Sequence, residues 1–288
     1  MSQQQLLPST AGRDFMRRAS GNRSFVIGSS IVLVYLVIAL LGSWLAPYDP
    51  YKQNLERTLE GVSWSHPLGR DELGRDILSR IMTGARLTLG ITAVATLLGL
   101  TIGVSLGAIS GFFGGRTDAI IMTGINVMLG FPELLIALAI ISVLGSGTFN
   151  LMLAIGLGAI PSFARLVRAS VLVIRTESFV DAARAMGFSA RRVILRHILP
   201  NMVAPLLVHT TYTMAAAILI ASGLSFLGLG VQPPASEWGV MLSRGRDYFR
   251  VAPHLVTTPG LAITFAVLGI NLIGDGLRDL LDPKLIRS

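Results

Sequence analysis

The chain has 288 residues, of which 52% are hydrophobic and only 14% are charged. A water-soluble domain usually carries about 25% charged residues, so this composition excludes a protein whose surface is mostly solvated. Cysteine is absent, which excludes disulfides and thiolate metal sites. The net charge of +8 does not indicate nucleic-acid binding, because the arginines flank apolar runs without an aromatic and basic platform.

Six stretches are long and apolar enough to cross a bilayer. A spanning helix needs about 20 apolar residues, because each residue rises about 1.5 Å across a core about 30 Å thick. The predicted spans are 25–46, 87–112, 118–144, 151–174, 205–229 and 257–276. The first run is too long for the core of a signal peptide, and we interpret it as a retained helix. We therefore expect an all-α integral membrane protein with six transmembrane helices.

Arginine placement predicts the orientation of these spans. If six helices alternate, most arginines lie on one side, which is the cytoplasmic side by the positive-inside rule. Both termini are then cytoplasmic. The predicted parts are a basic tail (1–24), the first helix (25–46), an extracytoplasmic segment (47–86), a five-helix core (87–276) with a cytoplasmic loop (175–204), and a C-terminal tail (277–288).

The extracytoplasmic segment contains a doubled Gly-Arg-Asp motif within Leu68-Gly-Arg-Asp-Glu-Leu-Gly-Arg-Asp76. Opposite charges alternate there, which is typical of a solvated loop that neutralises its own charge. A docking surface for another protein is an equally good interpretation. Residues 77–82 then predict a short amphipathic helix that leads into the second span.

Glycines recur every fourth residue in the second span. That spacing places them on one helical face, where small residues let another helix backbone approach closely. Packing inside this subunit and packing against another subunit are both compatible with the pattern. The glycines of this face are Gly99, Gly103, Gly107 and Gly111.

The third span contains the sequence Phe131-Pro132-Glu133. Proline removes a backbone donor and kinks a helix. An ionisable group inside a membrane is costly and usually faces a polar cavity or partner. We therefore predict that Glu133 lines a translocation path. The alternatives are a neutral, hydrogen-bonded carboxyl or a position near the membrane surface.

Two short helices are predicted in the loop after the fourth span. Ser178 can cap the first by accepting from the amide of Asp181, and the carboxylate suits the positive helix end. Alanines make this helix thin, and Gly187 can end it in a left-handed conformation. Ser189 can cap a second helix that ends at Pro200. A thin helix between two turns suits a partner's groove, although an ordinary amphipathic surface pair fits the same pattern.

A further short helix is predicted between the fifth and sixth spans. Ser236 can cap it, and Glu237 is favourable in its first turn. Trp238 suits the boundary between membrane and water. We expect an interfacial helix on the extracytoplasmic side.

Motifs for catalysis are missing from the chain. The two lysines follow Tyr51 and Pro283, so neither completes a phosphate-binding Walker A loop. The four histidines form no His-Glu-x-x-His pair, and there is no Gly-x-Ser-x-Gly nucleophile motif. We predict no catalytic residue, no metal site and no cofactor in this chain.

Against this background, Asp181-Ala-Ala, Gly187 six residues later, and Ile198-Leu-Pro200 resemble the EAA loop of ABC importer membrane subunits. Asp181 replaces the usual glutamate and keeps its charge. Further motifs are similar to the peptide/nickel branch, in which two related permeases pair, and this chain resembles the second, shorter one. These motifs are His66–Asp76, Gly223–Gly230 with Gln232-Pro-Pro, and Gly274–Pro283.

The resemblance implies a type I ABC importer permease in a bacterial inner membrane. It implies as partners a second homologous permease, an extracytoplasmic solute-binding protein, and two ATPase subunits that bind ATP and magnesium. The expected solute is a small peptide, dipeptide, oligopeptide or glutathione-like, with nickel complexes or opines as alternatives. A secondary transporter is the more distant alternative, because the repeated halves expected of one are missing. The implied ATPase-coupling residues are Phe179, Val180, Asp181, Ala182, Ala183, Arg184, Ala185, Met186 and Gly187.

Overall fold

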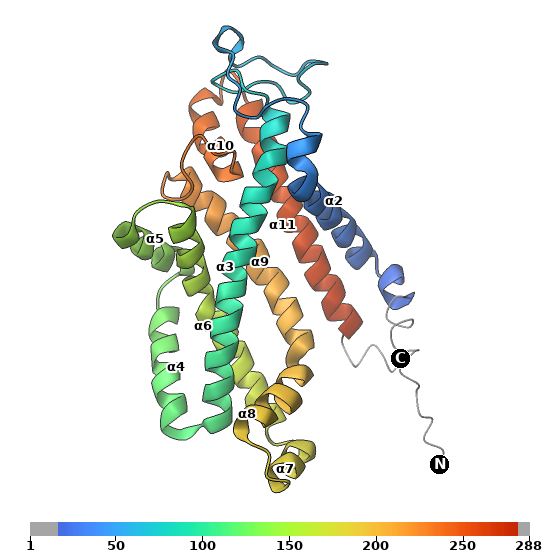
Figure 1. The fold of residues 1–288 in the computed structure, drawn as a ribbon, viewed down its shortest axis with the longest axis vertical. Helices are drawn as coiled ribbons and strands as arrows, with labels where there is room; N and C mark the ends of the chain where they lie inside the picture. Colours follow the sequence, from blue (N-terminus) through green and yellow to red (C-terminus); the bar gives the residue numbers. More distant parts are fainter. Residues whose placement is uncertain (1–16, 282–288) are drawn as a thin grey trace.

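The computed structural model describes residues 17–281, and over that range it is built from helices without a strand (Figure 1). The predicted terminal tails lie partly outside this range, at 1–16 and 282–288. The helices are α2 (Arg23–Leu45), α3 (Ile77–Phe113), α4 (Gly115–Leu129), α5 (Glu133–Leu144), α6 (Thr148–Ile174), α7 (Ser178–Ala185), α8 (Ala190–Val193), α9 (Val203–Phe226), α10 (Trp238–Gly245) and α11 (His254–Leu281). Shorter 3₁₀ or π segments are η1 (Leu55–Arg57), η2 (Ile194–Ile198), η3 (Leu199–Met202) and η4 (Arg246–Tyr248).

Five continuous helical runs are long and apolar enough to span a membrane: α2, α3, α6, the run Ala190–Phe226, and α11. The third predicted span is not continuous, because α4 and α5 meet at an angle of 90° and can form a sixth span only as a pair. The expectation of a mere kink was wrong. Gly130 and Pro132 cause the break, since proline forces its preceding residue out of the helical region.

Local signals set the ends of the long helices. The side chain of Asn22 caps α2 by accepting from the amide of Phe25. The side chain of Asp76 caps α3 by accepting from the amide of Ser79 at 2.7 Å. Gly114 follows α3 with a φ of +66°, a conformation that favours glycine, and turns the chain back into α4.

Helix α3 crosses the whole molecule and packs against α6 through its glycine face (Figure 1). A methyl group on Gly99 would lie 2.8 Å from Cβ of Ala159, and one on Gly103 would lie 2.5 Å from Cβ of Phe163. Gly107 and Gly111 meet α6 in the same way, one and two turns further on. The glycine face is therefore used inside this subunit, where it lets two backbones come close.

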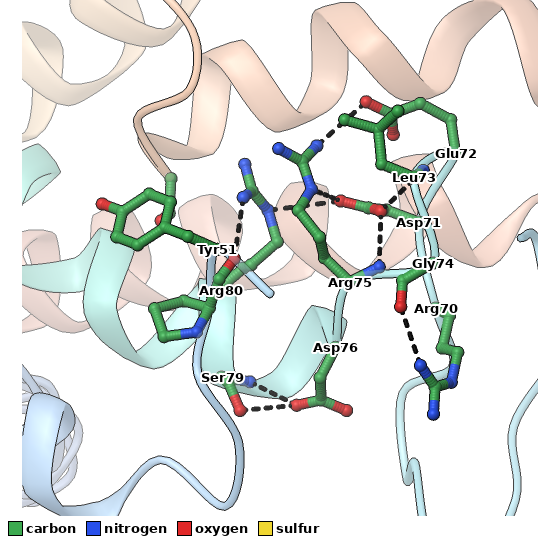
Figure 2. A network of polar contacts seen from close by, with 12 residues as sticks. Tyr51, Arg70, Asp71, Glu72, Leu73, Gly74, Arg75, Asp76, Ser79 and Arg80 are labelled. Atoms are coloured by element: carbon green, nitrogen blue, oxygen red, sulfur yellow. Dashed lines mark hydrogen bonds and ion pairs between the residues drawn. The ribbon is translucent and has the colours of Figure 1, made fainter. Parts of the chain in front are cut away.

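The segment between α2 and α3 folds as a cap over one end of the helices, opposite α7 (Figure 1). We call residues 46–76 the cap. Asp71 is its centre (Figure 2). One carboxylate oxygen of Asp71 accepts from the amides of Leu73 and Arg75, each at 2.9 Å. The other accepts from Nε of Arg75 at 2.6 Å and lies 3.4 Å from Nε of Arg80.

A second chain of polar contacts joins the cap to the start of α3. Asp76 lies 2.8 Å from Nδ1 of His66, whose Nε2 lies 2.6 Å from the guanidinium of Arg70. Asp71, Arg75, Asp76 and Arg80 are all at least 95% buried. The interpretation of this motif as a solvated loop is therefore wrong, because its charges satisfy one another inside the protein. Nη1 of Arg80 also donates to the carbonyl of Pro50, which fastens the cap to α3.

Helix α10 fills the space beneath the cap. Glu237, not Ser236, is its N-cap and accepts from the amide of Val240 at 2.9 Å. Its side chain is fully buried, and this burial raises the pKa of the Glu237 carboxyl. Trp238 is also fully buried, and its Nε1 donates to the carbonyl of Ile81 at 3.1 Å. The indole is thus enclosed by protein and does not face lipid or water, and Gly84 on α3 leaves room for it and for the carbonyl of Ser236.

Candidate coupling site and translocation path

The thin helix predicted after the fourth span is α7, and it projects from the end of the molecule opposite the cap (Figure 1). Its C-terminus is a complete Schellman motif. The amide of Phe188 donates to the carbonyl of Ala183 at 3.2 Å, and that of Gly187 donates to Arg184 at 2.9 Å. Gly187 has a φ of +79°, the left-handed conformation that the sequence predicted for it. The helix is therefore stopped sharply after two turns.

The N-terminus of α7 differs from the predicted capping box. Glu177 occupies the N-cap position, and no side-chain hydrogen bond caps the helix. The backbone carbonyl of Glu177 instead accepts from the amides of Val180 and Asp181. The prediction placed the cap one residue too late, at Ser178. Asp181 remains in the first turn, where its charge suits the helix dipole.

The two faces of α7 have different surroundings. Val180 and Ala183, three residues apart, are fully buried and belong to a cluster with Val167 and Val171 of α6. The other seven predicted coupling residues are exposed. They include Phe179, whose side chain is 41% exposed, and Met186 at 64%. The helix thus presents an apolar, solvent-facing side while its opposite side is fixed to the membrane domain.

Aromatic contacts hold α7 and the turn behind it in place. The guanidinium of Arg184 lies 5.0 Å from the ring centre of Phe112, at the end of α3. That of Arg192 lies 4.1 Å from the ring centre of Phe188, which also stacks with His197. Sequence reasoning did not identify these contacts. Phe188 carries a usable signal, since a hydrophobic residue commonly follows a Schellman glycine, but Phe112 does not.

The chain continues from α8 into α9 without the predicted stop at Pro200. Residues 190–226 form one run, in which a π-helical turn and a 3₁₀ turn lie before and at the proline. The amide of Leu199 donates to the carbonyl of Ile194, five residues back. These turns change the hydrogen-bond pattern around Pro200, which has no N–H to donate, so the helix continues past it. The segment after α7 therefore leads directly into a membrane span.

Partly buried polar contacts join α3, α4 and α6 near α7. Asp118 of α4 accepts from Nε and Nη2 of Arg168 on α6, both at 2.6 Å, and also from the hydroxyl of Ser110. Nη1 of Arg175 donates to the carbonyl of Gly111 at 2.9 Å. The support beneath α7 is therefore a set of helices tied together by charge-assisted bonds.

Glu133, the predicted pathway residue, is the first residue of α5, at the bend after α4. Its side chain is half-buried and lies against Gly158 of α6, where a methyl group would come within 2.9 Å of its Cγ. The carboxylate thus stands at the break in the third span, beside a glycine that leaves space for it. An irregular backbone at membrane depth is typical of sites that line a cavity or a protein interior.

Comparison with known proteins agrees with this architecture. Residues 103–287 match the model of the binding-protein-dependent transport system inner membrane component. The chain belongs to this family. Residues 10–61 also match the N-terminal transmembrane domain of oligopeptide transport permease C. The chain is thus a multi-pass inner-membrane permease subunit, and ATP hydrolysis lies in separate subunits of its transporter.

Curated relatives align over nearly the whole chain. The glutathione transport system permease protein GsiD of Pectobacterium atrosepticum is 42% identical over 96% of this chain and 92% of the relative. The di/tripeptide transport system permease protein DppC of Pseudomonas aeruginosa is 43% identical over 95% and 92%. Both are therefore similar to this chain over nearly its whole length.

A solved structure supports the fold. A chain of the MetNI methionine ABC transporter, in an inward-facing conformation, superposes with a TM-score of 0.58 at 21% identity, covering 70% of this chain and 96% of that chain. The type I ABC importer permease fold predicted from the EAA-like loop is therefore confirmed.

Proposed function

We propose that this permease carries small peptides, of the dipeptide, oligopeptide or glutathione-like class, into the cell. Two ATPase subunits act on α7, a second homologous permease completes the path, and a solute-binding protein docks at the cap. The observation that carries the coupling role is the exposed apolar side of α7 on a fixed base. In this proposal α7 and both termini of the chain lie on the cytoplasmic side of the membrane.

The proposed mechanism follows from how α7 is mounted. An ATPase groove that grips Phe179 and Met186 moves α7 as a unit, because the Schellman turn keeps the helix short and rigid. Val180 and Ala183 are buried among side chains of α6 and of the run leading into α9, so they transmit that movement to two membrane spans. A close-packed interior transmits displacement with little compression. The spans then alternate between inward-open and outward-open states.

Replacing Gly187 with valine tests the coupling role. A β-branched residue in the left-handed conformation costs about 1–2 kcal/mol, so the end of α7 should unwind. We expect solute uptake by the assembled transporter to fall about tenfold or more, because a cost of about 1.4 kcal/mol corresponds to a factor of ten. The chain should stay in the membrane, and ATP hydrolysis should continue. Uptake into reconstituted vesicles, with ATP hydrolysis measured in parallel, checks this.

Asparagine at the same position is the matched control, because it tolerates the left-handed conformation. A methyl group on Gly187 meets no atom within 4 Å, so a clash does not complicate the comparison. Normal uptake by Gly187→Val, or an equal loss in Gly187→Asn, would argue against the coupling role of this turn.

The peptide assignment is supported by the names of the relatives, which include glutathione and di/tripeptide permeases. Co-purifying the associated binding protein and identifying its retained ligand by mass spectrometry tests it. We expect a short peptide. A nickel complex or an opine would overturn the substrate class and leave the fold and the coupling role intact.

Glu133 is proposed to line the path of the solute. Substituting glutamine or alanine removes its charge at the bend, and we expect the KM or the rate of uptake to change several-fold. Leu134→Ala is the control, because Leu134 is the next residue in the chain, is 40% exposed and carries no charge. Uptake kinetics of both Glu133 variants indistinguishable from those of the wild type would rule this role out.

A further inference from the structure

A groove of about 470 Å³ lies between the last turns of α3 and the segment formed by α8, η2 and η3. All of its lining residues except Ser105 and Arg191 are apolar, among them Ile109, Phe113 and Leu195. The Ser105 hydroxyl already donates to the carbonyl of Thr101 at 2.7 Å. Among the residues that line the groove, the guanidinium of Arg191 is therefore the polar group left to bind a ligand, and the remaining lining is apolar.

The groove follows the last turns of α3. Phe113 is the last residue of α3, and Val104 lies nine residues earlier on the same helix. At 1.5 Å per residue, the lining of α3 covers about 13 Å of depth. The span predicted within α3 is 87–112, so this stretch forms the α7 end of that span, where we infer that the helix leaves the hydrocarbon core. An acyl chain lying along α3 matches this direction and this polarity.

One positive charge, that of Arg191, lines the groove. Arg191 is exposed on α8, and the exposed Arg196 follows on η2. The carboxylate of nearby α7, Asp181, lies 3.9 Å from Arg184, so it pairs with a different arginine. Guanidinium groups bind phosphate through two parallel hydrogen bonds. The groove thus offers a cation where the headgroup of a lipid would lie.

We propose that this groove binds one anionic phospholipid, with an acyl chain along Ile109 and Leu195 and the phosphate at Arg191. The bound lipid fills the space between the end of α3 and the segment that supports α7. The proposal requires only that α3 spans the membrane, so it stands independently of the solute and of the coupling role.

Lipid retention by the full-length chain, purified with its partner subunits, tests the proposal. Native mass spectrometry after exchange into mixed phosphatidylglycerol and phosphatidylcholine nanodiscs would count the lipids that remain bound. We expect one retained phosphatidylglycerol in preference to phosphatidylcholine. Arg191→Gln should weaken this retention about fivefold, the loss expected for one basic residue at a membrane surface. Ser105→Phe, which fills the groove, should abolish it.

Matched controls separate the site from general effects of charge and bulk. Arg250→Gln removes an exposed arginine at the cap end, and Leu97→Phe enlarges an exposed side chain two turns deeper on α3. Both should retain the lipid as the wild type does. Equal retention in Arg191→Gln and Arg250→Gln, or no preference for phosphatidylglycerol over phosphatidylcholine, would overturn the proposal.

A cysteine placed in the groove distinguishes lipid from a protein occupant. The chain has no cysteine of its own, so Ile109→Cys can be labelled at a single site. We expect a nitroxide at this position to be reached by a relaxation agent dissolved in the lipid. Efficient crosslinking of Ile109→Cys to the paired permease would instead show that a protein helix covers the groove, and the lipid site would be wrong.

Discussion

Gly103→Leu will separate α3 from α6 and destabilise the membrane domain by about 3 kcal/mol or more, because overpacking of a tight contact forces the backbones apart. A methyl group alone would lie 2.5 Å from Cβ of Phe163, and Phe163 is fully buried and unable to move aside. The loss should appear as a lower Tm and a smaller folded fraction in fluorescence-detected gel filtration of the detergent-solubilised chain.

Gly90→Leu supplies the control on the same helix, since a methyl group there meets nothing within 4 Å. Both substitutions add the same side chain to α3 and the same helix propensity. If the two variants have the same Tm, the glycine face does not hold α3 against α6, and its packing role would be wrong.

Asp71→Ala will produce the second large effect, a destabilisation of about 3–5 kcal/mol, as expected when one member of a buried ion cluster is removed. Arg75 would lose its bond to this carboxylate at 2.6 Å, and Arg80 would lose its ion pair at 3.4 Å. Two buried cations would then repel each other beneath the cap. We expect a markedly lower Tm and protease cleavage within residues 46–76.

Asp247→Ala tests the same substitution on an exposed pair, because Asp247 is 74% exposed where it meets Arg246. Exposed ion pairs contribute about 0–1 kcal/mol, so its Tm should hardly change. Equal effects of Asp71→Ala and Asp247→Ala would mean that the cap charges are solvated after all, as the alternating sequence suggested.

Local patterns were enough to predict the features that depend on neighbouring residues. Gly187 ends α7 in the predicted conformation because a left-handed residue is required wherever a helix turns back so sharply. The spacing of Gly103 and Gly107 predicted a close-packed face, since four residues make about one helical turn. The N-cap of α7 was predicted at Ser178 and is Glu177, because a helix end can shift by one residue at little cost in free energy.

Other features depend on groups that lie far apart in the chain. A kink at Pro132 could be predicted, but the break of 90° between α4 and α5 depends on how α5 packs against α6. Trp238 has the sequence features of an interfacial residue, yet its side chain is fully buried, because Gly84 on a different helix lets Ser236 and the indole approach closely. Glu237 was expected in a first turn and is instead the N-cap, through a local bond from the amide of Val240. Its complete burial and its contact with the hydroxyl of Thr88 on α3 come from packing between helices.

The sequence by itself determined an all-helical membrane protein, because apolar runs require helices in lipid. The Asp181–Gly187 pattern predicted a short helix after the fourth span, and its resemblance to the EAA loop of ABC importers implied a permease. Only the tertiary structure decided which surfaces are available. It buried the cap charges around Asp71, assigned the glycine face to α6, and left Phe179 and Met186 facing outward. The physical reason is that burial and charge pairing are set by segments brought together in space, whereas helix formation and helix ends are set by residues a few positions apart.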